Sequence, residues 1–195
     1  MNDIYDPLLN YISNRIKVNE KDCQIIKESF TPKTIEKKEL LFKQGGVCTT
    51  TSFILKGSMR MFYLDKKGLE HVLYFGFPDW WVSDIGSFYQ HTPSLLNGQA
   101  LERTELLIST YDKMEELFTE VPALERLFRV ITQKNLAALQ QRFLSTVSET
   151  ADQRYLKLLK RAPNIEQLVP QHQIASYLGI LPESFSRLKR QLHSK

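Results

Sequence analysis

Residues 171–192 of this chain read QHQIASYLGILPESFSRLKRQL, a pattern typical of two short helices joined by a tight turn. Ile174 and Leu178 are four residues apart, so they share one face of a first helix. Gly179 follows directly and can adopt the left-handed conformation that ends a helix without steric cost. Pro182 fits the first turn of a second helix, where its missing N–H is not needed. The stretch predicts a helix-turn-helix.

The second helix of this motif has an apolar face and a charged face. Its apolar face holds Phe185, Leu188 and Leu192. Glu183, Arg187 and Arg190 lie almost opposite, because each residue turns the helix by about 100°. Arginine can donate two hydrogen bonds to guanine, and glutamate can accept one from the amino group of cytosine. We expect Glu183 and Arg187 to read neighbouring base pairs of double-stranded DNA; the plainer alternative is an ion pair on a helix surface.

Other polar residues of the motif are candidates for contacts with the DNA backbone. The full predicted DNA-binding set is Gln171, His172, Glu183, Ser184, Ser186, Arg187, Lys189 and Arg190. Residues 1–150 hold 18 Lys and Arg against 19 Asp and Glu, whereas residues 151–195 hold 8 against 3. A basic terminal segment on a near-neutral body is typical of a phosphate-binding module. Charge alone leaves open a basic helix that is merely solvated.

Upstream of the motif, turn signals recur at an even spacing. They are Gly45-Gly46, Lys56-Gly57, Lys67-Gly68, Pro78-Asp79 and Asn97-Gly98. The segments between them are rich in β-branched and aromatic residues, as in residues 51–55, 59–63 and 71–75. Short strands at this spacing predict an antiparallel sandwich or barrel, with a hairpin at residues 65–68.

Residues 121–147 predict one long helix, because they contain no glycine and a single proline at the second position. Two apolar sets with helical spacing are offset from each other: Leu124, Phe128 and Ile131, then Leu136, Leu139 and Phe143. We expect one face to meet the β domain and the other to meet a second copy of the helix, so these six are the candidate residues for a homodimer. The alternative is that both faces are buried within one monomer.

The predicted fold class is α+β with three parts. A β-rich sensor domain spans residues 1–120, a long connecting and dimerisation helix spans residues 121–147, and a helix-turn-helix domain spans residues 148–195.

Two patterns of this chain occur together in one known family. The first pattern is Ile174, Gly179, Glu183, Ser184 and Arg187 in the helix-turn-helix, and the second is FILKGS at residues 53–58 followed by a Lys-Lys-Gly hairpin. On these residues the chain resembles the Crp/Fnr (cyclic-AMP receptor protein/fumarate-nitrate regulator) superfamily, over about residues 25–192. The resemblance implies a cyclic-nucleotide-binding-like jelly roll and a bacterial homodimeric transcription regulator that reads an inverted-repeat operator. RNA polymerase is a further candidate partner.

The chain departs from this family where relatives hold the cyclic nucleotide. Relatives carry Gly-Glu and, six to eight residues later, Arg-Ser/Thr-Ala, whereas this chain has SDIG at residues 83–86 and LLNGQA at residues 95–100. Residues 83–100 contain no Lys or Arg. Because a buried phosphate needs a charged partner, we expect that cyclic AMP is not the effector. The exception would be that Arg60 or Arg103 reaches in from a neighbouring strand.

An apolar pocket for an unknown small-molecule effector is a further hypothesis. Its candidate residues are Tyr74, Trp80, Trp81, Ser83, Asp84 and Phe88. The alternative is that these aromatic side chains simply form core.

Catalytic and metal-binding patterns are missing from the sequence. Cys23 and Cys48 lack metal-ligand spacing, the four histidines are scattered, and no GxSxG or P-loop occurs. We therefore expect no enzyme and no cofactor or metal. A competing interpretation is a small-ligand sensor or cupin-like metal-binding protein with a vestigial helix-turn-helix, although only His71 and His91 lie in the roll. Without a signal peptide or membrane-spanning segment, a cytoplasmic protein with no membrane partner is expected.

Overall fold

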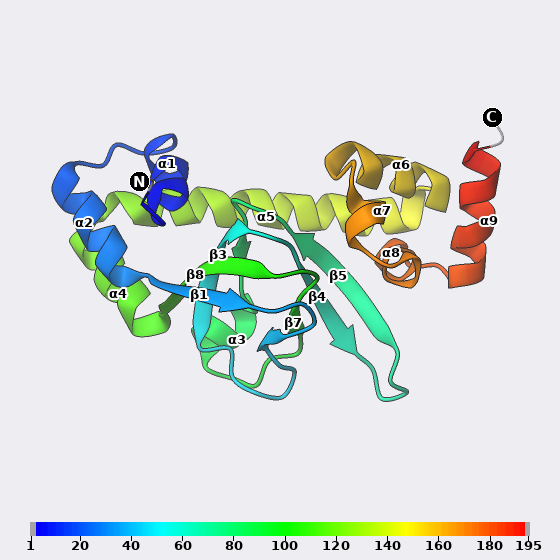
Figure 1. Cartoon of the computed structure of the whole chain (residues 1–195), viewed down its shortest axis with the longest axis horizontal. Coiled ribbons are helices and arrows are strands. Elements are labelled where there is room, and N and C mark those ends of the chain that lie inside the picture. Colours follow the sequence, from blue (N-terminus) through cyan, green and yellow to red (C-terminus); the bar gives the residue numbers. More distant parts are fainter. Residues whose placement is uncertain (1–2, 194–195) are drawn as a thin grey trace.

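The structure, a computed structural model, describes residues 3–193. Its helices are α1 (Asp6–Ser13), α2 (Glu20–Ser29), α3 (Ile85–Gln90), α4 (Tyr111–Glu120), α5 (Ala123–Ser148), α6 (Ala151–Arg161), α7 (Ile165–Leu168), α8 (Gln171–Leu178) and α9 (Pro182–His193). Its strands are β1 (Thr31–Ile35), β2 (Leu40–Phe42), β3 (Thr50–Lys56), β4 (Met59–Leu64), β5 (Glu70–Gly76), β6 (Trp81–Val82), β7 (Asn97–Ala100) and β8 (Thr104–Thr110). Figure 1 shows the strands gathered at the centre, with α5 running past them to the C-terminal helices.

The strands form two four-stranded sheets, with antiparallel pairing between neighbours. One sheet has the order β1-β8-β3-β6 and the other the order β2-β7-β4-β5. Apolar side chains of both sheets fill the space between them, including Ile54, Met59, Met61 and Leu106, each of which is fully buried. This confirms the predicted α+β fold with a β roll in the N-terminal part.

The hairpin between β4 and β5 turns at Asp65–Gly68. Gly68 has a φ of 81°, which glycine adopts without strain. The Asp65 carboxylate accepts hydrogen bonds from the backbone N–H groups of Lys67 and Leu69, at 2.8 and 2.9 Å. The turn predicted from Lys67-Gly68 is confirmed, and it leaves β5 at the edge of its sheet.

Helices α1, α2 and α4 and the first turns of α5 cover the other sheet, where they pack on Phe53 and Leu107. Leu124 of α5 is fully buried in this cluster, and Phe128 and Ile131 pack against it. The prediction that these three residues take part in dimerisation is therefore corrected for Leu124, which has no surface to offer. The first apolar set, Leu124, Phe128 and Ile131, packs against the β domain.

The rest of α5 leaves the roll and exposes its second apolar set. Leu136, Leu139 and Phe143 are 56%, 64% and 70% exposed, respectively. These three side chains are called the α5 stripe below. Because α5 has 26 residues, it is about 39 Å long at 1.5 Å per residue.

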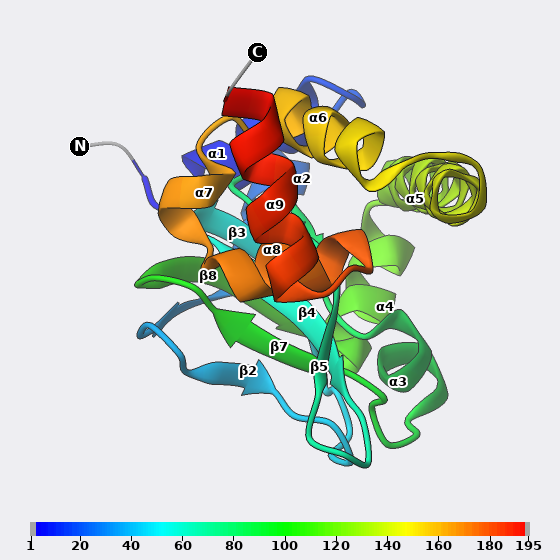
Figure 2. The same ribbon diagram turned by 90° about the vertical axis from the view of Figure 1, so that its right-hand side faces the viewer.

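A small helical domain follows α5. Thr150 and Gln153 form a capping box at the start of α6, where each side chain bonds to the backbone N–H of the other. Tyr155, Ile174 and Phe185 are buried together as its core. Figure 2 shows α8 lying over β5, with α9 on the outside of the domain.

Candidate nucleic-acid interface

The turn between α8 and α9 sets the position of the candidate reading helix. Gly179 ends α8 in the left-handed conformation, with a φ of 70°. The carbonyl oxygen of Leu181 accepts a hydrogen bond from the N–H of Phe185 at 3.0 Å, which closes the first turn of α9. Phe185 and Leu188 are buried, and the Phe185 ring meets the Tyr155 ring edge-on at 5.1 Å. One face of α9 is thereby fixed against its own domain.

The opposite face of α9 is open to solvent. Glu183, Ser186, Arg187 and Arg190 are all exposed. Glu183 and Arg187 are one turn apart, about 6 Å along the helix axis, which is comparable to the rise of about two base pairs of B-DNA. Arg187 donates a hydrogen bond to Ser184 at 3.3 Å, which holds the guanidinium along the helix. This face can present an acceptor and a fork of donors to base edges.

Lys189 does not belong to that face. Its ammonium group lies 2.7 Å from the Glu166 carboxylate, and its side chain is only 19% exposed. Glu166 also accepts a hydrogen bond from the Tyr155 hydroxyl, and burial together with this carboxylate raises the pKa of Tyr155. The predicted DNA contact at Lys189 is corrected: its position on the flank of α9 directs it toward α7, where it ties two helices together.

The two candidates on α8 lie at the exposed start of that helix. Gln171 and His172 follow Pro170, whose carbonyl oxygen accepts hydrogen bonds from the N–H groups of Gln173 and Ile174. His172 lies near Glu70 of β5. Arg60 holds the pKa of the Glu70 carboxyl below its ordinary value, and His172 adds to this effect.

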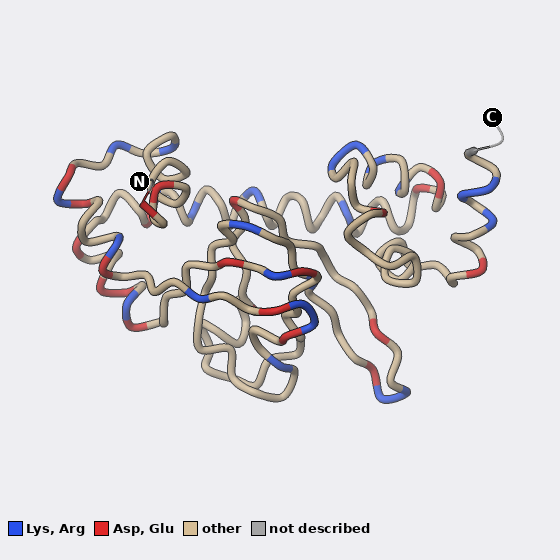
Figure 3. The backbone as a smooth tube through the Cα atoms, in the orientation of Figure 1, with Lys and Arg blue, Asp and Glu red and all other residues tan. Residues whose placement is uncertain are grey.

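Charge is distributed unevenly over the described residues. Figure 3 shows basic positions along α6 and α9, with a second group around the N-terminal end of α5. Lys157 of α6 pairs with Glu149, and Arg161 lies over the Trp80 ring at 4.6 Å. Part of the C-terminal basic charge is thus used within the protein.

The six candidate effector-pocket residues do not line one pocket. Trp81 packs outside the roll, against Phe53 at 5.2 Å and Phe128 at 4.8 Å, and Phe88 belongs to the same cluster. Tyr74 lies on the other side, where its hydroxyl donates to the Ser83 carbonyl oxygen at 3.4 Å. The predicted pocket is therefore wrong as a single site. The aromatic side chains are packed in two separate cores.

Asp84 is held by hydrogen bonds from its own neighbourhood. Its carboxylate caps α3 through the Ser87 N–H at 3.2 Å and accepts from the Ser94 hydroxyl at 2.7 Å and the Leu95 N–H at 3.1 Å. These bonds close the segment between β6 and β7 around the carboxylate.

The two arginines that could have supplied a phosphate partner point elsewhere. Arg60 forks onto the Glu70 carboxylate, with one bond of 2.8 Å, and also bonds Gln99 at 2.9 Å. It stacks over Phe62, which belongs to the cluster shared with the C-terminal helices. Arg103 is exposed and pairs with Glu36 at 3.4 Å.

The contact between α8 and β5 joins residues far apart in the chain and could not be predicted from local spacing. Ser176 bonds the edge of β5, and Arg142 of α5 donates to the carbonyl oxygens of Val72 and Tyr177 at 3.3 and 3.2 Å. Arg142 also lies over the Tyr177 ring at 4.2 Å, and burial lowers its pKa. These contacts join the helix-turn-helix to the roll within one protomer.

Residues 3–193 hold neither a metal-binding cluster nor a membrane-spanning helix. Among these residues no group of three or more His, Cys, Asp or Glu side chains is placed to hold a metal ion. No helix in the same range combines the length and apolarity that crossing a membrane requires.

Comparison with known proteins places these features in context. A family model described as the cyclic nucleotide-binding domain matches residues 32–121. The transcriptional activator Anr of Pseudomonas protegens is 26% identical over 165 residues, which cover 79% of this chain and 67% of the relative. The transcriptional activator FnrA of Stutzerimonas stutzeri is 27% identical with the same coverage. These relatives are regulators and not enzymes.

Solved structures share the fold over nearly the whole chain. The c-di-GMP responsive regulator CLP of Xanthomonas campestris superimposes with a TM-score of 0.73 at 15% identity, covering 90% of this chain and 92% of that one. FixK2 of Bradyrhizobium japonicum gives a TM-score of 0.70 at 19% identity, covering 85% of both chains.

Proposed function

Because the chain belongs to the Crp/Fnr family of DNA-binding transcription regulators, we propose that it acts as a homodimer whose two α9 helices read the half-sites of an inverted-repeat operator. The observation that carries this proposal is the outer face of α9. Glu183 and Arg187 are exposed there one turn apart, while Phe185 and Leu188 anchor the opposite face. A helix anchored in this way can enter a major groove with its charged residues toward the bases.

The α5 stripe supports the homodimer. Leu136, Leu139 and Phe143 would cover one another if a second α5 ran alongside. The helix-turn-helix follows the C-terminal end of α5 (Figure 1). A parallel pair of α5 helices would therefore carry both α9 helices at one end, as two half-sites on one DNA require. Half-sites of such dimers are centred about 34 Å apart.

The proposed regulator does not depend on cyclic AMP. Residues 83–100 contain no Lys or Arg, and the Asp84 carboxylate lies within this segment. Arg60 and Arg103 are paired with Glu70 and Glu36, respectively. A cyclic phosphate placed there would lose its hydration without gaining a cationic partner. The roll then either holds an uncharged effector or holds none, and DNA affinity is set constitutively or by the amount of protein.

Partners and location follow from this role. The proposed dimer binds double-stranded DNA in the bacterial cytoplasm and acts on transcription through RNA polymerase. Genome-wide mapping of bound DNA tests the function. We expect recurrent inverted repeats upstream of genes, and binding spread without any shared sequence would contradict the proposal.

A further inference from the structure

The uncovered side of α5 changes from charged to apolar along the helix. At about 100° per residue, Glu125 and Arg129 lie within about 40° of the line through the α5 stripe. The buried residues Leu124 and Leu127 lie on other sides of the helix, which pack against the roll. The surface that is apolar near the helix-turn-helix therefore continues as a charged surface near the N-terminal end of α5.

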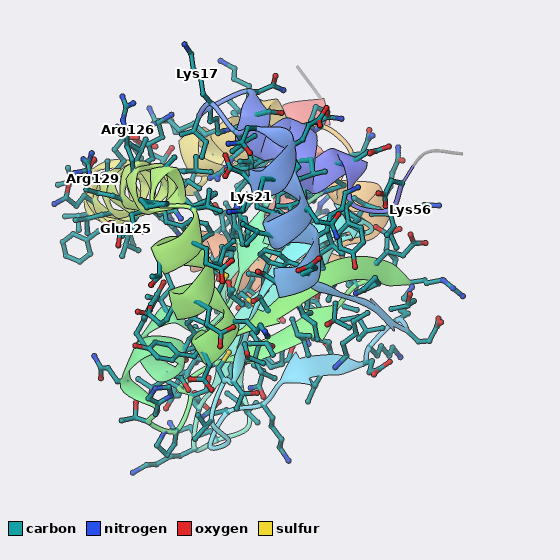
Figure 4. The ribbon with its side chains drawn as sticks, turned by 90° about the vertical axis from the view of Figure 1, so that its left-hand side faces the viewer. Lys17, Lys21, Lys56, Glu125, Arg126 and Arg129 are labelled. Atoms are coloured by element: carbon teal, nitrogen blue, oxygen red, sulfur yellow. The ribbon has the colours of Figure 1, made fainter. Side chains whose placement is uncertain are left out.

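Glu125 and Arg129 are exposed and take part in none of the ion pairs found among residues 3–193. Figure 4 looks toward the N-terminal end of α5 and shows both side chains, with Arg126, on the side of the helix that faces away from Lys21 of α2. The opposite charges of Glu125 and Arg129 are thus offered outward, beside the surface proposed to meet a second copy.

We propose that this charged surface docks a second copy of the chain, with Glu125 of each protomer paired with Arg129 of the partner subunit. The proposal rests on the homodimer proposed above. In a parallel, in-register pair, residues of equal number lie at equal height, so Glu125 is about 6 Å along the axis from Arg129 of the partner subunit. The side chain of arginine can span that distance. The twofold axis produces two such pairs.

The charges select the alignment of the two helices more than they add affinity. Exposed ion pairs contribute little to affinity. An antiparallel pair would place Glu125 beside the apolar end of its partner and leave both charges unmatched. A parallel pair in register is therefore favoured, and it is the pairing that brings both α9 helices to one end.

A second arrangement has to be distinguished by experiment. Glu125 and Arg129 are four residues apart, so they could pair along their own helix. The variants E125R and R129E separate the two cases. In the E125R chain, positions 125 and 129 are both positive. In the R129E chain, both positions are negative. Only pairing between copies lets an E125R chain and an R129E chain match each other.

The test measures dimer dissociation constants of the full chain by sedimentation equilibrium, at about 50 mM salt to limit screening. Each variant alone is expected to dissociate about tenfold more readily than the wild type. An equimolar mixture, with one chain tagged to change its mass, is expected to form mainly the heterodimer in native mass spectrometry. K134E makes the same charge change as R129E on the opposite side of α5 and is expected to dimerise like the wild type.

Two results would overturn the pairing: variants that dimerise as tightly as the wild type, or variants that are weakened but show no preference for the heterodimer. A wild-type chain that stays monomeric would contradict the proposed homodimer itself. Circular dichroism melting of each variant confirms that the single protomer is folded.

Discussion

The Ser176 hydroxyl of α8 donates a hydrogen bond to the carbonyl oxygen of Glu70 on β5 at 2.7 Å. The oxygen of the Ser176 hydroxyl in turn accepts a hydrogen bond from the N–H of Val72 at 3.0 Å. One side chain thus satisfies two backbone groups on the free edge of a sheet, and it does so across the boundary between the roll and the helix-turn-helix.

Replacing Ser176 with alanine should loosen this boundary. Two hydrogen bonds are lost and a partly buried backbone N–H is left without a partner, so the free energy of unfolding should fall by about 1–2 kcal/mol. Denaturant unfolding measures this change, and hydrogen exchange should show faster exchange at Val72. Ser186→Ala removes an exposed hydroxyl that bonds only Pro182 of its own helix, and should leave stability nearly unchanged. Equal effects of the two substitutions would contradict the role of Ser176.

Lys189→Ala should affect folding more than DNA binding. Because Lys189 is paired with Glu166 and mostly buried, its loss should lower the free energy of unfolding by about 1 kcal/mol, with a small change in DNA affinity. Parallel measurements of unfolding and of binding to random DNA check this. A stable variant that binds all DNA more weakly, with a shallower salt dependence, would instead restore Lys189 as a phosphate contact.

Leu139→Glu should separate the dimer. The substitution places a negative charge in the α5 stripe of each protomer. When two copies meet, these charges would have to be buried without a partner. Leu144→Glu is the matched control, since Leu144 is 62% exposed against 64% for Leu139 but lies on another side of the helix. Light scattering at micromolar concentration should give a monomer for Leu139→Glu and a dimer for Leu144→Glu. If both variants remained dimers, the α5 stripe would not be part of the dimer interface.

Cyclic AMP should produce no heat of binding when titrated calorimetrically into the protein at micromolar concentrations. The expected reason is the carboxylate of Asp84 in the segment between β6 and β7, with no arginine turned toward it. Titration into a cyclic-AMP-binding protein under the same conditions is the positive control. Micromolar binding accompanied by a gain in DNA affinity would contradict cyclic-AMP independence.

The features that the sequence predicted well depend on local spacing. Gly179 and Pro182 mark the turn of the helix-turn-helix. The three- and four-residue spacings of Phe185, Leu188 and Leu192 mark the buried face. Each of these signals lies within one or two helical turns. The long helix and the hairpin at Asp65–Gly68 were predictable for the same reason.

The features that were predicted wrongly or not predicted at all depend on contacts between distant residues. Trp80 and Trp81 are adjacent in sequence, but neighbours along an extended chain face opposite sides, so they entered different cores. The bond between Ser176 and Glu70 joins positions 106 residues apart. The pairing of Lys189 with Glu166 likewise depends on how α7 packs on α9. Spacing within one element carries no information about such contacts.

Binding of Arg187→Ala to specific and random DNA tests the central claim, that the exposed face of α9 reads bases, most directly. The measurement takes the operator found by genome-wide mapping and every single base-pair change in one half-site. The variant should lose about 1–3 kcal/mol on the operator, lose its preference at one base pair of each half-site, and change little on random DNA. An equal loss on operator and random DNA, with every base preference retained, would show that Arg187 contacts only phosphate and would contradict the account.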